Sequence, residues 1–436
     1  MSREDAAPNI VLITTHDTGR HLSCYGVGSV HSPNLERLAA QGCRFTEYFA
    51  AAALCSPSRG AMMTGRYPQS NGMLGLCHGL FGWSLNDDER HLSHLLHEAG
   101  YYTALIGHQH ETTDIDGQLC FDEHRLHWED LSRGLHTTCD QVAEGVGEFL
   151  RERAGQSRPF YLQVGFFETH RPFDFGGAEP DDSKGVYVPP YLEDNQAARD
   201  ELAAFQGNIR KMDAAVGEIL RHLDDARLAE HTLVIYSVDH GIPFPRAKAT
   251  LYDPGIEIAL LMRWPGRIEA GSSRDWLLSN VDLVPTVLDL AGLEAPDSLE
   301  GHSFASAFEP GSEPTREMIF AEHHGHGADG ESRCVRTPRQ KLIRNFAPQP
   351  QPAVPVDVSR PAGGGKRAHV ELYDLENDPL ETQNVADSPD YADLRQELDG
   401  LLWNWLERVD DPILRGPVAT PYYRAAILPY RRSSES

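Results

Sequence analysis

The sequence predicts an α/β fold in which a large, mixed and mostly parallel sheet is sandwiched between helices. Short apolar runs alternate with segments of helical periodicity up to about residue 332. Polar residues and glycine follow the apolar runs directly, which is typical of strands that end at a ligand-binding edge. A chain of 436 residues that is 40% hydrophobic is also long enough to bury the core that such a sheet requires.

The predicted strands are buried apolar runs bounded by turn-prone residues. The first covers residues 9–13 and is followed at once by Thr-His-Asp-Thr-Gly. The others cover residues 101–106, 159–166, 232–237 and 318–321. In an open parallel sheet, ligands bind beyond the carboxyl ends of the strands, so the polar residues in those places are the first candidates for function.

The predicted helices are set by capping residues and by apolar periodicity. Residues 33–40 form one helix, because Ser32 is a favoured N-cap, Pro33 suits the first helical position and Gly42 follows the end. Another helix is expected to start at Pro57. Further helices are predicted for residues 91–98, 197–223 and 283–290.

The pattern changes after about residue 333. Residues 335–346 and 370–373 indicate antiparallel strands, and residues 392–408 indicate one helix. We therefore divide the chain into a main α/β domain, residues 1–332, and a smaller α+β domain, residues 333–436. Residues 347–365 are rich in Pro and Gly, and predict either a loop over a site entrance or a surface insertion.

The formal net charge of −26 argues against nucleic acid or an anionic membrane as a partner. An anionic substrate then requires a local pocket of His, Arg, Lys and metal that acts against the field of the whole chain. Seven scattered cysteines do not resemble a disulfide framework.

No targeting or membrane segment is apparent in the sequence. The first apolar run is too short for a signal peptide and lacks a basic segment before it. No stretch approaches the roughly 18 apolar residues of a membrane span. We expect a cytoplasmic protein with no membrane partner.

Cys55 begins the pattern Cys-x-Pro-x-Arg, which ends at Arg59 and is followed five residues later by Thr64-Gly65. A lone cysteine before a helix is usually a small buried residue, and it can also be a thiolate activated by the helix N-terminus. The whole pattern, however, resembles the signature of type I, formylglycine-dependent sulfatases. The resemblance implies an alkaline-phosphatase-like fold and hydrolysis of a sulfuric ester or sulfamate.

In that family a formylglycine-generating enzyme oxidises the cysteine to an aldehyde, whose hydrate supplies the nucleophile. The resemblance therefore implies that Cys55 is modified and that Arg59 holds the hydrated group in a charge-assisted hydrogen bond. It also implies that the helix start near Pro57 offers a positive dipole end to the nucleophile.

The resemblance also implies one divalent cation, held by two residue pairs that follow strands. The pairs here are His16-Asp17 and Asp239-His240, with the oxygen carried by residue 55 (Cys55) completing the shell. Two adjacent Asp are usual at the first pair, so His16 departs from the family. The family implies Ca²⁺, whereas imidazole ligands favour Mn²⁺ or a similar ion. His16 alone is equally well explained as a hydrogen-bonding residue at a strand end.

Four further residues match catalytic positions of the family. His110 matches the histidine of Gly-Lys-x-His and is expected to assist the diol, and His108 stands where Lys is usual. His108 replaces that Lys only when it is protonated. His170 matches the general acid at the leaving group, and Lys248 matches the cation that clamps the sulfuryl group. A solvated surface position is the plainer explanation for His108 and Lys248.

One branch of the family is more similar than the others. Residues 69–76, 241–245 with 251–255, and 371–384 resemble the sulfamidases, the heparan N-sulfatases. The leading substrate is then a small anionic sulfated molecule of the N-sulfated amino-sugar class. A phosphonate monoester or phosphodiester hydrolase is an alternative, because those relatives also use formylglycine and carry Asp-His at the second pair. A non-catalytic descendant is the third possibility, suggested by His16 and His108.

Overall fold

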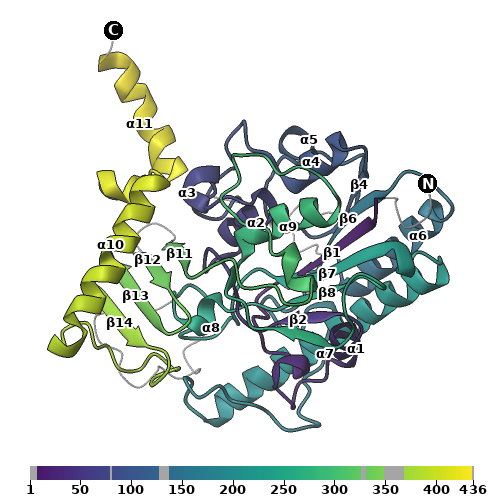
Figure 1. The fold of residues 1–436 in the computed structure, drawn as a ribbon, viewed down its shortest axis with the longest axis horizontal. Coiled ribbons are helices and arrows are strands. Elements are labelled where there is room, and N and C mark those ends of the chain that lie inside the picture. The colour runs from purple at the N-terminus through teal and green to yellow at the C-terminus, as the bar shows by residue number, and fades with distance from the viewer. Residues whose placement is uncertain (1–6, 79–80, 127–136, 326–329, 348–367, 435–436) are drawn as a thin grey trace.

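A computed structural model describes residues 7–78, 81–126, 137–325, 330–347 and 368–434 (Figure 1). Its largest element is an eight-stranded mixed sheet in the order β5-β4-β6-β1-β7-β8-β2-β9. The strands in that order are β5 (Glu123–Arg125), β4 (Tyr102–Gly107), β6 (Phe160–Gly165), β1 (Asn9–Thr15), β7 (Thr232–Val238), β8 (Leu260–Arg263), β2 (Cys43–Phe45) and β9 (Ser272–Arg274). The predicted fold class is confirmed.

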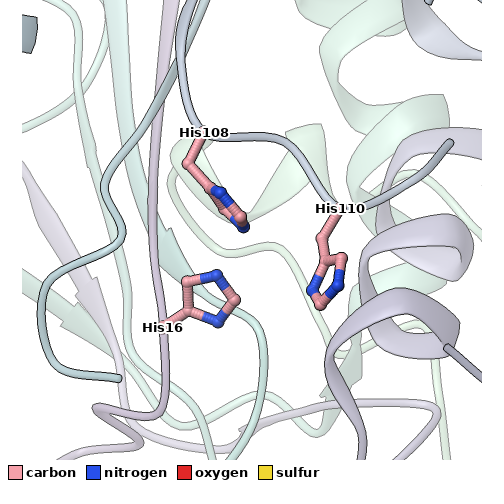
Figure 2. A group of neighbouring side chains, drawn as sticks. All are labelled: His16, His108 and His110. Carbon is pink, nitrogen blue, oxygen red and sulfur yellow. The ribbon is translucent and has the colours of Figure 1, made fainter. Parts of the chain in front are cut away.

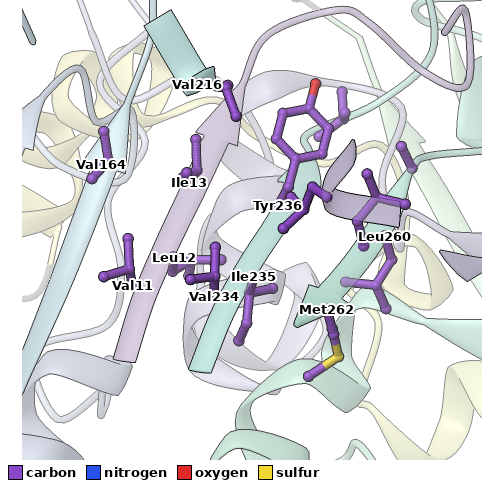
Figure 3. Close-up of a cluster of buried hydrophobic side chains, with 14 of the residues drawn as sticks. Val11, Leu12, Ile13, Val164, Val216, Val234, Ile235, Tyr236, Leu260 and Met262 are labelled. Atoms are coloured by element: carbon purple, nitrogen blue, oxygen red, sulfur yellow. The ribbon is translucent and has the colours of Figure 1, made fainter. Parts of the chain in front are cut away.

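The first five strands of that order run parallel, and β1 lies between β6 and β7. All seven residues of β1 are buried, as expected of a strand that is covered on both faces. Figure 3 shows the side chains of Val11 and Ile13 packed beside Val164 and Val234. The carboxyl ends of β1, β4, β6 and β7 therefore meet at one edge of the sheet.

Helices cover the sheet on both sides (Figure 1). On one side α1 (Pro33–Ala40), α6 (Cys139–Arg153) and α7 (Gln196–Asp225) pack together, and α2 (Cys55–Thr64) and α9 (Leu283–Leu290) lie on the other. Helix α4 (Leu92–Glu98) contacts β4. The sequence patterns missed α6, and α2 begins at Cys55 rather than at Pro57. The short helices are α3 (Pro68–Asn71), α5 (Ile115–Gln118) and α8 (Asp253–Ile256).

The predicted cap of α1 is wrong in its chemistry. Ser32 stands at the N-cap, but its side chain makes no capping hydrogen bond and contacts Ser23 instead. The carboxylate of Asp213, on α7, accepts from the backbone N–H of Asn34 at 3.1 Å and of Leu35 at 2.8 Å. A buried carboxylate on the neighbouring helix thus replaces the local cap.

The second sheet is antiparallel and has four strands, β11 (Ile319–His324), β12 (Glu331–Arg336), β13 (Gln340–Asn345) and β14 (Val370–Asp374). The predicted stretch 335–346 is in fact a hairpin of β12 and β13, closed by a hydrogen bond from Thr337 N to the Gln340 carbonyl. The predicted boundary at 332/333 falls inside β12, and the division into two domains stays a prediction. The predicted loop 347–365 lies outside the described residues, except for its first residue.

Helix α10 (Ala392–Arg408), predicted with the same bounds, packs on β12 and β13. The indole of Trp405 stacks on Phe320 at 4.8 Å between ring centroids and meets the edge of Tyr67 at 5.1 Å. Because Tyr67 belongs to the segment after α2, this aromatic cluster packs α10 and the antiparallel sheet against the main domain. Helix α11 (Pro421–Ser434) and the small sheet of β3 (Tyr48–Phe49) and β10 (Leu278–Ser279) complete the fold.

Each helix in the described part of the chain is either too short or too polar to span a lipid bilayer.

Replacing Asp213 by Ala tests the cap that α7 gives to α1. The change leaves two backbone N–H groups without an acceptor, that of Leu35 buried and that of Asn34 partly buried, so we expect a loss of about 1–3 kcal/mol in the free energy of unfolding. Urea denaturation followed by far-UV circular dichroism measures it. Asp225→Ala, on the exposed face of the same helix, is the matched control and should cost less than about 0.5 kcal/mol. Equal losses in the two variants would show that Asp213 does not act as the cap.

Candidate active site

Two residue pairs meet because β1 and β7 are parallel and in register. Thr15 is paired with Val238, so His16-Asp17 and Asp239-His240 leave the sheet side by side. The backbone of Asp17 has φ 46, in the left-handed region that Asp tolerates better than most residues. Its N–H donates to Asp239 Oδ1 at 2.9 Å. The structure thus brings together the two residue pairs that the sequence predicts as metal ligands.

The carboxylate of Asp239 is the most heavily hydrogen-bonded group of the site. Its Oδ1 accepts from the backbone of Asp17 and, at 2.8 Å, from that of His240. Its Oδ2 lies 2.9 Å from His16 Nδ1 and 3.2 Å from Arg59 Nε. Burial alone raises the pKa of this carboxyl, but His240, His16 and Arg59 outweigh that effect and hold the pKa well below its usual range. Asp239 is therefore a permanent anion.

Cys55 is the first residue of α2 and is 2% exposed. Its Sγ lies 3.2 Å from His240 Nε2. Burial raises the pKa of the thiol far above its ordinary value, although Lys248 opposes this, so the unmodified side chain is a neutral thiol. A thiolate activated by the helix N-terminus, one of the two simpler explanations, does not fit this environment.

Arg59 is fully buried one helical turn after Cys55. Besides Asp239, its guanidinium donates to Thr14 Oγ1 at 3.1 Å and to the Thr15 carbonyl at 3.0 Å. The side chain therefore fixes α2 against the ends of both β1 and β7. Its expected contact with the modified residue 55 stays a prediction.

Lys248 contacts the carboxylate of Asp17. Its Nζ lies 2.8 and 2.9 Å from the two carboxylate oxygens, and 22% of its side chain is exposed. Burial disfavours both charges, but their attraction lowers the pKa of Asp17 and raises that of Lys248. Lys248 is thus an ammonium ion at the mouth of the site and not a solvated surface residue.

The donor atoms around Asp17 and Asp239 fit a divalent cation. His240 Nδ1 donates to the Gly241 carbonyl at 3.0 Å, so Nε2 is the nitrogen that faces Asp17 Oδ1, at 3.2 Å. A carboxylate oxygen and an imidazole nitrogen in this arrangement can serve together as ligands of one cation. Ligand atoms of His16, Asp17, Cys55 and Asp239 also lie within 4.8 Å of one another. Mixed oxygen and imidazole donors suit Mn²⁺ as well as Ca²⁺.

Three histidines gather beside this group (Figure 2). His108 and His110 follow β4, and their ring centroids lie 4.7 and 5.8 Å from that of His16. Burial lowers the pKa of His16 to about 3 and those of His108 and His110 well below their ordinary value. All three rings are therefore neutral near pH 7, and the protonated His108 that would replace a lysine does not fit this environment.

His170 follows β6 and is half-buried. Its Nδ1 donates to the Arg171 carbonyl at 2.7 Å, so Nε2 is the nitrogen available for substrate. Burial and Lys248 lower the pKa of the ring, which is neutral in the free protein at pH 7. Together with Lys248, it is one of the two predicted site residues that are accessible to solvent, and these two mark the open side of the site.

Sequence reasoning missed three residues that support the site. The Nδ1 of His78 lies 2.5 Å from His110 Nε2. Asn208 Oδ1 accepts from Thr169 N at 2.6 Å and holds that residue at φ 77, directly before His170. A Cys-His pair at 77–78 was the one local sign of His78, and no local pattern points to Asn208 or to Glu322.

Glu322, on β11, holds the segment that leads to Cys55. Its backbone N–H donates to the Ala51 carbonyl at 2.9 Å, and its carbonyl accepts from Ala53 at 3.3 Å. The side chain is buried 3.6 Å from Arg333, whose guanidinium is engaged by Asp411. Burial raises the pKa of Glu322 to about 8, because Arg333 offsets only part of the desolvation.

Comparison with known proteins gives two family matches. Residues 8–293 match the family described as "Sulfatase", and residues 244–353 match the one described as "N-sulphoglucosamine sulphohydrolase, C-terminal".

Two curated relatives resemble almost the whole chain. Human N-sulphoglucosamine sulphohydrolase is 30% identical over 94% of this chain and 92% of its own length. An ulvan-active sulfatase of Formosa agariphila is 28% identical over 93% of this chain and 75% of its own length.

Solved structures share the fold. One protein, in complex with its substrate D-glucosamine-2-N,6-O-disulfate, has a TM-score of 0.75 and 20% identity over 94% of this chain and 99% of its own. The phosphonate monoester hydrolase of Agrobacterium radiobacter has a TM-score of 0.72 and 21% identity over 92% and 96%.

The raised pKa of Glu322 predicts a pH-dependent stability. Between its unfolded value of 4.5 and about 8, the folded chain keeps a proton that the unfolded chain has lost, so stability falls as pH rises. The contribution reaches about 4–5 kcal/mol across that window. Glu322→Gln should remove it, which chemical denaturation at several pH values measures. Glu309→Gln, at an exposed position, is the control, and its stability should depend on pH as that of the wild type does. If Glu322→Gln also shows the wild-type pH dependence, the side chain of Glu322 is ionised throughout and the prediction is wrong.

Proposed function

Because the chain belongs to the sulfatase family, we propose that it hydrolyses the sulfamate of an N-sulfated amino sugar through a formylglycine formed from Cys55. Family membership makes the chain a sulfuric ester hydrolase. The observation that carries the proposed mechanism is the position of Cys55, whose Sγ lies 3.2 Å from His240 Nε2 in the same buried group as Asp17 and Asp239. A side chain there is held against the residues that would hold the cation.

The substrate class rests on the relatives. The human relative is named for N-sulfoglucosamine, and the family match over residues 244–353 carries the same name. The matched segment contains Lys248 and the strands β11, β12 and β13 of the antiparallel sheet, so it includes part of the site and its surroundings. An N-sulfated glucosamine is accordingly the substrate that we test first.

The local charges favour an anionic substrate in spite of the net charge of −26. Asp17 and Asp239 carry two negative charges, and Arg59 and Lys248 carry two positive ones within hydrogen-bond distance of them. Because burial keeps His16, His108 and His110 neutral, they add no charge to these two anions and two cations. A bound dication therefore leaves a net positive site, where low dielectric strengthens the attraction of a sulfate group.

Asp17, Asp239, His240 and residue 55 are the side chains that would hold the cation, with His16 Nδ1 beside Asp239. A divalent ion supplies Lewis-acid stabilisation of negative charge on sulfuryl oxygens. A formylglycine, made by a formylglycine-generating enzyme, would add water to its aldehyde, and a hydroxyl of this hydrate would be the nucleophile.

The remaining steps belong to side chains of the chain itself. Lys248 contacts Asp17 from the solvent side of the site. One of its three ammonium N–H groups can instead donate a hydrogen bond to a sulfuryl oxygen of the substrate. His170 presents Nε2 toward the open side, and it gives a proton to the leaving nitrogen once it has become an imidazolium. His110 turns Nε2 to His78, and its expected role at residue 55 stays a prediction.

A phosphonate monoester hydrolase is the second candidate function. One observation in its favour is His240, because those enzymes also carry Asp-His at the second residue pair, and its Nε2 faces Asp17 here. The other is that a phosphonate monoester hydrolase has the same fold. Phosphoryl and sulfuryl groups are both tetrahedral anions and are stabilised by the same positive charges. Only measured turnover of the two kinds of substrate therefore distinguishes the two functions.

The proposed function predicts a ranked substrate panel. The purified chain, produced with a formylglycine-generating enzyme, should hydrolyse glucosamine N-sulfate and an activated aryl sulfate with higher kcat/KM than an aryl phosphonate. Mass spectrometry of the peptide that contains residue 55 should show an aldehyde in place of the thiol. Cys55→Ala should abolish turnover and retain the fold. An active enzyme with an intact thiol, or a preference for the phosphonate, would contradict the proposal.

The general-acid role predicts a pH limb that depends on the leaving group. Because His170 donates only when protonated and its pKa lies below the ordinary 6.5, kcat/KM for glucosamine N-sulfate should rise as the pH falls from about 7.5 to about 5.5. His170→Gln should flatten this limb and lower the rate about 10²–10⁴-fold. The activated aryl sulfate, which needs no proton, is the control substrate. Equal losses on both substrates would exclude a general acid at this position.

A further inference from the structure

A second group of ligand atoms lies on the far side of His16 from the carboxylates. We propose that His16, His108 and His110 bind a divalent first-row transition metal ion, of the class of Zn²⁺ or Co²⁺, at a site distinct from that of Asp17 and Asp239.

The three imidazoles converge from two strand ends. His16 follows β1, and His108 and His110 follow the neighbouring strand but one, β4. Their ligand nitrogens lie within 4.8 Å of one another, and Figure 2 shows the three rings turned toward one common space. None of the three side chains is more than 7% exposed. The cluster is thus an enclosed nitrogen site and not a solvated group of histidines.

Two of the rings have one nitrogen engaged and one directed to the cluster. His16 Nδ1 contacts Asp239 Oδ2 at 2.9 Å, and His110 Nε2 contacts His78 at 2.5 Å. Among the described residues, His16 Nε2 and His110 Nδ1 are buried and have no hydrogen-bond partner. Histidines that ligate metals usually hold their second nitrogen against a carboxylate or another polar group in this way. The supporting contacts fix which nitrogen each ring offers.

The ligand type selects the class of ion. Three neutral imidazoles with no carboxylate among them suit Zn²⁺, Co²⁺, Ni²⁺ or Cu²⁺, whereas Ca²⁺ requires oxygen ligands. Zinc bonds of about 2.0–2.1 Å in a tetrahedral shell place ligand nitrogens about 3.3 Å apart. Small rotations of the rings, which bring their nitrogens about 1.5 Å closer at most, therefore close the shell and leave its fourth position for water or substrate.

A competing cluster shares one of these residues. Cys77, His78 and His110 also present ligand atoms within 4.8 Å of one another. The thiol of Cys77, however, donates to the His110 carbonyl at 3.4 Å and accepts from Ser56 at 3.5 Å. Cys77 and His78 therefore serve as the supporting layer behind His110, and the three-histidine cluster is the favoured one.

Metal titration of the full-length protein tests this site. After chelation and dialysis, Zn²⁺ binding is measured by calorimetry, and Co²⁺ binding by visible absorption, which reports nitrogen ligands directly. His108→Ala should remove one equivalent of bound Zn²⁺ relative to the wild type, or weaken it by more than about 100-fold. His108→Lys should do the same, because a protonated ammonium does not bind metal. His110→Gln serves as the second variant where His108→Ala does not fold.

Two controls separate the alternatives. Cys77→Ser should retain the wild-type stoichiometry, and so should His21→Gln, at a buried histidine outside the cluster. Unchanged Zn²⁺ binding in folded His108→Ala and His110→Gln overturns the proposal, and loss in Cys77→Ser moves the ion to the competing cluster and overturns it too. The measurements require neither turnover nor modification of Cys55, so their outcome is independent of the proposed function.

Discussion

The carboxylate of Asp239 is the interaction on which the site depends. It accepts hydrogen bonds from the backbone after β1, from the backbone after β7 and from Arg59 on α2, and it contacts His16. One anion therefore fixes two strand ends and the helix that begins at Cys55. A buried charge with so many partners is costly to disturb, because loss of any one leaves the others without compensation.

Burial gives the groups around Asp239 different roles. It leaves the carboxylates ionised, because cations and N–H groups surround them, and it makes His16, His108 and His110 neutral, because charged imidazoles would lose their hydration. Neutral rings are metal ligands and hydrogen-bond partners. The permanently positive side chains of the site are then Arg59, which is buried, and Lys248, which is partly exposed to solvent. This separation lets an acidic protein present a positive group only where the site opens.

Much of the arrangement was predictable from local sequence. Apolar runs followed by polar pairs locate the strand ends, and the pattern from Cys55 to Gly65 locates the helix that carries the proposed nucleophile. Long-range contacts were not predictable in this way. Asp213 caps α1 from far along the chain, Glu322 reaches the segment before Cys55 from the second sheet, and His78 meets His110 across a loop. The protonation of His108 also depends on burial among other histidines, which residue spacing does not reveal.

The enclosure of Cys55 has a consequence for the life of the protein before it is active. At 2% exposure, directly after a segment that is hydrogen-bonded to β11, this side chain is out of reach of another macromolecule. If residue 55 is converted to formylglycine as proposed, the converting enzyme has to meet it on the nascent or unfolded polypeptide. Oxidation would then compete with folding, and molecules that folded first would keep the thiol. The yield of working enzyme would accordingly be set by the rate of folding as much as by the abundance of the catalyst.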